Sequence, residues 1–153
     1  MRQIAVRRHR VSAMTIMVMD AQGGGIGRQV VSAIRDRIPD AEILAVGTNS
    51  AATAAMVKAG ADHGATGENA AAVCSRRADF IVGPIGIVIA DAMYGEITPA
   101  IAEAVGKSRA QRVLIPMRNC GNTVAGVANY QISSLIREAV DVISQNRESN
   151  KTT

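Results

Sequence analysis

Short apolar runs alternate with amphipathic helical segments along most of the chain, and this alternation is the feature that most restricts its fold. The runs 15–20, 42–47, 62–66, 79–83 and 111–117 predict buried strands, and helical spacing of apolar residues follows most of them. Such an order predicts right-handed crossovers and a parallel sheet covered on both faces. We expect a doubly wound, Rossmann-like α/β sandwich of five or six mostly parallel strands in the order 3-2-1-4-5. The flavodoxin-like order 2-1-3-4-5 is the alternative.

Local signals predict the remaining elements. Ser50 is expected to cap a helix that runs through Ala59, because its hydroxyl can accept a hydrogen bond from the first turn. The pair Thr98-Pro99 is typical of a helix start, and the clearest amphipathic helix begins near Ile132. Further predicted elements are a helix over 68–76, a helix within 84–93 and a short sixth edge strand over 123–127.

The length and charge distribution indicate one domain that is not built for nucleic acid. The chain has 153 residues and a formal net charge of +4, but four arginines before Met14 account for that whole excess. The rest of the chain is formally neutral, so no nucleic-acid partner is expected. We predict a single domain over 14–146, a disordered basic extension over 1–13 and a disordered tail over 147–153. The extension is either an interaction arm or, as we favour, extra residues upstream of a true start at Met14.

Cysteine spacing and hydropathy restrict the location of the protein. Cys74 and Cys120 stand alone, which is typical of a reduced cytoplasmic protein and not of a disulfide framework. The longest nearly apolar run, 80–90, is too short to span a bilayer, so no membrane partner is expected. No cluster of His, Cys, Asp and Glu has the spacing of metal ligands, so no metal site is predicted.

A glycine-rich stretch, DAQGGGIG over 20–27, follows the first predicted strand and opens the first helix. Backbone N–H groups of such a turn, together with the helix N-terminus, make a site for phosphate, and side chains there would block the anion. The predicted phosphate-binding residues are Gln22, Gly23, Gly24, Gly25, Ile26 and Gly27. The dinucleotide fingerprint is incomplete, because Gln22 stands where its first glycine belongs. The alternative is a tight turn that only lets the helix pack on the sheet.

The residues at the end of the second strand indicate which type of nucleotide could bind. An Asp or Glu normally binds the ribose of NAD there, but the chain has Thr48, Asn49 and Ser50. These side chains are the candidates for the ribose side, and they could accept the 2′-phosphate of NADP. For Ser50 we prefer the simpler role of a helix cap.

A second glycine loop follows the fourth predicted strand. In the order 3-2-1-4 it faces the first loop across the crevice where ligands bind in such sheets. The predicted binding residues in it are Gly83, Pro84, Ile85 and Gly86. The alternative is that Pro84 and Gly86 only shape the turn.

Catalytic signals are sparse. Neither tyrosine has a lysine four residues later, so the base of short-chain dehydrogenases is missing. Two candidates stay open: Asp20 at the end of the first strand could take a proton, and Cys120 could be a nucleophile. His63 is expected to be structural, and Asp91 and Glu96 are expected to be solvated or to cap a helix.

Four blocks together resemble a small bacterial family known only as a domain of unknown function. These blocks are DAQGGGIG, GTNSAAT, KAGADHGATGEN and GPIGIVIAD, and the resemblance covers about residues 14–130. It implies a Rossmann-like fold and a cytoplasmic protein, and it implies no reaction. The residues before Met14 depart from it.

The sequence therefore predicts a Rossmann-like protein that binds a nucleotide or dinucleotide, with NADP or NAD as the first candidates. The ligand is expected to be a small phosphorylated molecule and the protein a homo-oligomer. If it is an enzyme, an NAD(P)-linked oxidoreductase is the first guess. The alternatives are a non-enzymatic metabolite sensor or assembly module, and an oligomer in which the glycines serve packing only.

Overall fold

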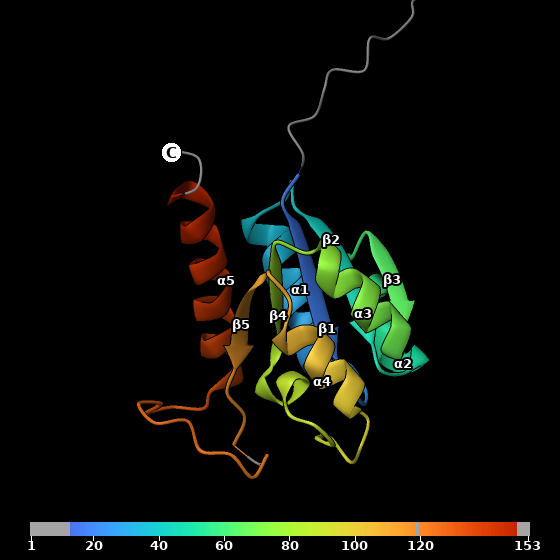
Figure 1. The fold of residues 1–153 in the computed structure, drawn as a ribbon. Helices are drawn as coiled ribbons and strands as arrows, with labels where there is room; N and C mark the ends of the chain where they lie inside the picture. The colour runs from blue at the N-terminus through green and yellow to red at the C-terminus, as the bar shows by residue number, and fades with distance from the viewer. Residues whose placement is uncertain (1–12, 119, 150–153) are drawn as a thin grey trace, which may run out of the picture.

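A five-stranded parallel sheet forms the centre of the computed structural model, which describes residues 13–118 and 120–149 (Figure 1). Its order is β3-β2-β1-β4-β5, and every neighbouring pair is parallel. The predicted Rossmann-like order is thus confirmed, and the flavodoxin-like order is not found. The strands are β1 (Thr15–Asp20), β2 (Glu42–Gly47), β3 (His63–Thr66), β4 (Phe80–Pro84) and β5 (Gln111–Ile115).

The helices cover the two faces of the sheet. The helical elements are α1 (Gly25–Arg37), α2 (Ser50–Lys58), α3 (Glu68–Arg77), the 3₁₀ helix η1 (Ile85–Val88), α4 (Pro99–Gly106) and α5 (Ile132–Ser149). The chain moves outward from β1 to β3 and then returns to β4 and β5 on the other side. Right-handed crossovers therefore place α1 and α2 on one face and α3 and α4 on the other, and α5 joins α1 (Figure 1).

The core is aliphatic and lies on both faces of the central strands. Ile16 and Val18 pack in the cluster beneath α1 and α5, whereas Met17 and Met19 pack in the cluster beneath α3 and α4. All four are fully buried. Successive side chains of a strand point to opposite faces, so a continuously apolar strand is the pattern that a sheet covered on both sides requires.

Two predicted elements are wrong. The segment 84–93 does not become an α-helix: it forms only the four-residue η1 and then turns, with positive φ at Asp91 (63°) and Met93 (55°). No strand forms over 123–127 in the described part of the chain. Pro116, directly after β5, has no N–H for a sheet ladder, and Gly126 has φ 88°, so the chain leaves the sheet edge there.

The domain ends partly differ from the prediction. Helix α5 continues to Ser149 and so includes residues 147–149, which the sequence predicts to be part of a disordered tail. Arg147 forms an ion pair with Asp40 in the turn between α1 and β2, with Nη1 2.7 Å from Oδ1, and this contact ties the last turn of α5 to the body. The predicted disorder of residues 1–12 and 150–153 falls outside the described residues.

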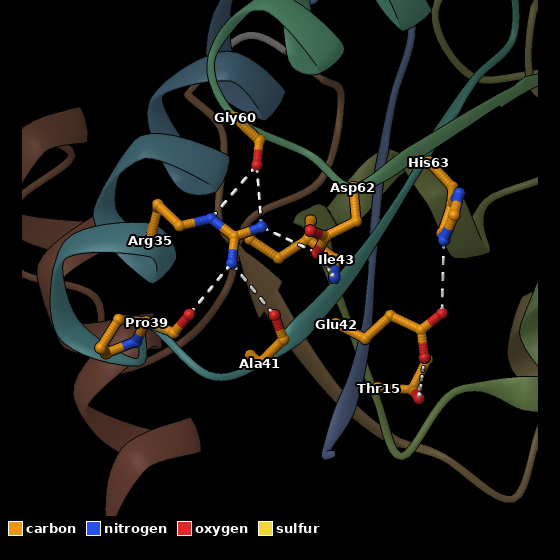
Figure 2. A network of polar contacts seen from close by, with 9 residues as sticks. All are labelled: Thr15, Arg35, Pro39, Ala41, Glu42, Ile43, Gly60, Asp62 and His63. Atoms are coloured by element: carbon orange, nitrogen blue, oxygen red, sulfur yellow. Dashed lines mark hydrogen bonds and ion pairs between the residues drawn. The ribbon is translucent and has the colours of Figure 1, made fainter. Parts of the chain in front are cut away.

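A polar network at the amino-terminal end of the sheet joins two turns (Figure 2). The guanidinium of Arg35 donates to the carbonyl of Gly60 at 2.8 and 3.2 Å, and to the carbonyls of Pro39 and Ala41 at 3.2 and 3.1 Å. It also donates to Oδ2 of Asp62 at 2.8 Å. One side chain of α1 thereby fixes both the α1–β2 turn and the α2–β3 turn.

Candidate functional site

The glycine turn at the carboxyl end of β1 is tight and closes on itself. The N–H of Gly24 donates to the carbonyl of Ala21 at 3.0 Å, and φ is positive at Gln22 (51°) and Gly24 (70°). A Cβ on Gly24 would lie 2.9 Å from the backbone of Ala52 in α2. Gly24 is therefore required by the fold itself, for both its dihedral angle and its close approach to α2.

Gly27 is required by the packing of α1 against its neighbours. A Cβ at this position would lie 2.6 Å from Sδ of Met56 and 2.8 Å from Cβ of Asp20. The missing side chain lets the first turn of α1 lie directly against β1 and α2.

Gly23 and Gly25 differ from the other two glycines of the turn. A Cβ on either would meet no atom within 4 Å, and neither has a positive φ. Within the described part of the chain, their N–H groups have no hydrogen-bond acceptor. Neither backbone conformation nor packing therefore explains why these two positions are glycine.

Asp20 is 5% exposed and lies beneath the turn. Its Oδ1 accepts the N–H of Ala21 at 2.8 Å, and its Oδ2 accepts the N–H of Gly27 at 2.7 Å. Burial raises the pKa of this carboxyl above its ordinary value, and the N–H groups of Gly27 and Ala21 oppose that rise. The side chain thus holds the turn together.

A cleft of about 900 Å³ opens on the β4–β5 side of the glycine turn. The turn supplies Gln22, Gly23, Gly25 and Ile26 to one wall, with Asp20 at its base. The β4 loop also lines this cleft. The lining residues from that loop are Pro84 and Gly86, whereas Gly83 and Ile85 are not among them.

Gly83 has a structural role instead. A Cβ there would lie 2.3 Å from the carbonyl oxygen of Met19, so the close approach of β4 to β1 requires glycine. Ile85 is half-buried in η1.

The outer wall of the cleft carries its aromatic and charged groups. Tyr94 comes from the turn after η1, and Tyr130 comes from the segment before α5. The guanidinium carbon of Arg118 lies 5.4 Å from the ring centroid of Tyr130. Cys120, one of the two candidate catalytic residues, is half-buried in this wall, and its Sγ lies 3.3 Å from the carbonyl oxygen of Met117.

The residues predicted for the ribose side lie on the other side of the turn and do not line the cleft. Thr48 and Asn49 both donate to Oε1 of Glu96, at 2.8 and 2.7 Å. Asn49 also accepts the N–H of Ala52 at 2.9 Å, so Asn49 caps α2 and the predicted cap at Ser50 is wrong. The amide of Asn49 reaches that N–H from the position before Ser50, which is already the first helical residue.

Glu96, which the sequence predicts to be solvated or to cap a helix, instead accepts hydrogen bonds from two loops. Its Oε1 also accepts the N–H of Gln22 at 3.0 Å, so one carboxylate joins the glycine turn to the end of β2. Desolvation would raise the pKa of this carboxyl, but the hydrogen bonds from Asn49, Thr48 and Gln22 outweigh it and lower the pKa. No local sequence pattern could predict these hydrogen bonds, because the partners of Glu96 lie 47, 48 and 74 residues away in the chain.

A family comparison covers nearly all of this architecture. The model described as "Domain of unknown function (DUF3842)" matches residues 15–148. The chain belongs to this family. This match confirms the resemblance to a domain of unknown function that the sequence blocks indicate.

The DUF3842 chain has no match among the curated proteins. Among solved structures it is similar to a dodecameric FMN-dependent UbiX-like decarboxylase from Escherichia coli O157:H7, with 18% sequence identity and a TM-score of 0.45. That match covers 86% of this chain and 76% of the other.

Other predicted features of the DUF3842 chain lie away from the cleft. His63 is exposed on β3, with Nε2 3.7 Å from Oε1 of Glu42 (Figure 2). Residues 13–118 and 120–149 contain no group of three or more His, Cys, Asp and Glu that could hold a metal ion. None of the helices in these ranges is both long and apolar enough to cross a bilayer.

Proposed function

We propose that the protein binds a small phosphorylated ligand of nucleotide type in the cleft between the glycine turn and the β4 loop. The observation that carries this proposal is the pair Gly23 and Gly25. Both line the cleft, and the fold gives no reason for glycine at either position. Close approach of a ligand to the backbone does give such a reason, because any side chain would stand in its way.

The electrostatics of the turn favour an anionic group at these two glycines. The N–H groups of Gly23 and Gly25 have no acceptor within the described residues and lie at the N-terminus of the 13-residue α1. A helix N-terminus carries a partial positive charge, and its exposed N–H groups bind phosphate. Arg118 adds a formal positive charge on the outer wall of the cleft, whose lining also includes the acidic residues Asp20 and Asp91.

The volume of the cleft suits a cofactor-sized molecule. Ligand pockets occupy roughly 300–1,000 Å³, and this one measures about 900 Å³. NADP and NAD, the first candidates from the sequence, therefore remain in the set to be tested, beside mononucleotides. We also propose a cytoplasmic homo-oligomer, in which a second copy covers part of the open outer wall.

One observation favours the second candidate function, a non-enzymatic sensor. Asp20 is the buried acid of the cleft, but both of its oxygens are engaged by backbone N–H groups. A general base needs an oxygen within hydrogen-bond reach of the substrate proton. Binding without chemistry is thus the alternative to an NAD(P)-linked oxidoreductase.

A melting-temperature screen tests the proposal. The panel contains NAD, NADP, their reduced forms, FAD, FMN, ATP, GTP, coenzyme A and inorganic phosphate. A ligand at 100 times its dissociation constant stabilises the folded state by about 2.7 kcal/mol, so we expect a clear rise in melting temperature for at least one nucleotide.

The matched variants are Gly25→Ala and Gly106→Ala. Each adds a Cβ that meets nothing within 4 Å, one at the start of α1 and one at the end of α4. We expect the ligand-induced shift to be reduced by Gly25→Ala and retained by Gly106→Ala. No shift across the panel, or an equal shift in both variants, would contradict the proposal.

A further inference from the structure

The two sides of the glycine turn are not equivalent. The cleft opens on the β4–β5 side, whereas the β2 side is occupied by the carboxylate of Glu96. Three donors from two separate segments, the glycine turn and the loop after β2, hydrogen-bond to the same oxygen of this carboxylate: Gln22, Thr48 and Asn49. An oxygen that accepts three hydrogen bonds is held in place, so Glu96 closes the β2 side.

A dinucleotide needs the side that Glu96 closes. In Rossmann-like sheets it lies across the end of the first strand, with one nucleoside at the end of the second. The polar side chains there are already used: Thr48 donates to Glu96, and Asn49 binds Glu96, the carbonyl of Gln22 and the N–H of Ala52. Glu96 also adds a negative charge where a second phosphate would approach.

The β4–β5 side of the glycine turn, where the cleft opens, offers aromatic surface for one planar ring of a ligand. The chain has only two tyrosines and no tryptophan, and both tyrosines line the cleft. Tyr94 is 100% exposed and Tyr130 is half-buried, so each presents ring surface to a ligand. Offset or edge-to-face stacking on such rings favours a planar aromatic group.

The turn that carries Tyr94 is strained and pinned. Met93 and Tyr94 have φ of 55° and 58°, a left-handed conformation that non-glycine residues adopt rarely. The N–H of Asp91 donates to the carbonyl of Ile97 at 2.8 Å and closes the turn, and Glu96 fastens it to the glycine turn. The same short segment thus holds an aromatic ring at the rim of the cleft and blocks the β2 side.

Building on the proposed function, we infer that the cleft takes a mononucleotide-type ligand and that Glu96 excludes dinucleotides. The phosphate binds at Gly23 and Gly25, and the planar ring lies against Tyr94 and Tyr130. Glu96 is then the specificity-determining residue, because it fills the place of the second nucleoside.

Calorimetric titration with matched probes tests this inference. The probes are FMN against FAD, and nicotinamide mononucleotide against NAD. We expect the mononucleotide of at least one pair to bind the wild type about tenfold or more tightly than its dinucleotide. In Glu96→Ala we expect this ratio to fall, because the dinucleotide gains affinity, whereas Glu96→Gln keeps the side-chain volume and most of the exclusion.

Tyr94→Ala provides the second readout. The side chain is fully exposed, so its loss leaves the fold intact. We expect the affinity for the bound mononucleotide to fall roughly two- to tenfold through loss of ring stacking. An unchanged affinity would overturn the assignment of Tyr94.

The outcomes also separate this inference from the proposed function. If NAD or FAD binds the wild type more tightly than its mononucleotide and weakens in Glu96→Ala, then Glu96 accepts a ribose hydroxyl and the exclusion is wrong. If both members of each pair bind equally and Glu96→Ala changes neither, the proposed function stands and this inference falls. If none of the four probes binds, both fall.

Discussion

The glycines of the β1–α1 turn have separate roles that single substitutions can distinguish. Gly24 and Gly27 are required by contacts within the fold, whereas Gly23 and Gly25 face open space in the cleft. A valine at Gly24 or Gly27 would therefore damage the protein itself, and loss of binding in such a variant would say nothing about the ligand.

The first prediction concerns the free protein. Gly25→Ala should raise the free energy of unfolding by about 0.4–1 kcal/mol, because alanine restricts the unfolded chain and Gly25 has no positive φ. Urea denaturation measures this change, and Gly106→Ala should show a similar gain. A destabilised Gly25→Ala would mean that the fold needs this glycine.

The second prediction concerns Gly27. Gly27→Ala should lower the free energy of unfolding by about 1–3 kcal/mol, the usual cost of overpacking. Its Cβ would lie 2.8 Å from Cβ of Asp20, an atom that cannot move without shifting β1. The same urea experiment checks it, and a neutral effect would show that α1 can move away from the sheet.

The third prediction is a pH dependence at Glu96. Its pKa is lower in the folded protein than in the unfolded chain, so its hydrogen bonds contribute stability at neutral pH that is lost as the pH falls through the folded pKa. The stability difference between the wild type and Glu96→Gln should therefore shrink on acidification. Denaturation at a series of pH values measures it, and a difference that grows toward low pH would contradict this account.

At the scale of elements, the Arg35 network fixes the α1–β2 turn and the α2–β3 turn, through which the chain returns from each helix to the sheet (Figure 2). The fourth prediction is that Arg35→Lys lowers the free energy of unfolding by roughly 1–3 kcal/mol, since an ammonium cannot reproduce the planar fork and leaves acceptors unpaired. Arg37→Lys is the control, because Arg37 is exposed and lies 3.6 Å from Asp141. Equal effects of the two substitutions would contradict the role given to Arg35.

The elements that the sequence predicts well are those with a local cause. Strand β1 is a continuous apolar run, and α4 begins at Thr98-Pro99, where the Thr98 hydroxyl accepts the N–H of Ile101. The segment after β4 has enough apolar residues for a helix, but it forms a turn whose Glu96 is hydrogen-bonded to the glycine turn and to the loop after β2. Those contacts depend on the finished fold, so periodicity could not indicate them.

At the scale of the whole molecule, a stabilising polar network and the candidate binding cleft lie at opposite ends of the sheet. The Arg35 network lies at the amino-terminal ends of β2 and β3, and the cleft lies at the carboxyl ends of β1 and β4. The alternation of strands and helices predicts both this topology and the glycine turn as a cleft wall. It could not predict Tyr94, Tyr130 or Glu96 as neighbours of that turn, because long-range chain folding brings them there.

The central claim is that the N–H groups of Gly23 and Gly25 hold the phosphate of the ligand. The most direct measurement follows the backbone amide signals in ¹H–¹⁵N spectra during titration with FMN, nicotinamide mononucleotide and inorganic phosphate. We predict that a bound probe shifts the signals of Gly23 and Gly25, while Gly64 and Gly106, which lie outside the cleft, stay unchanged. Saturable binding that leaves Gly23 and Gly25 unshifted, or no binding by any of the three probes, would contradict the account.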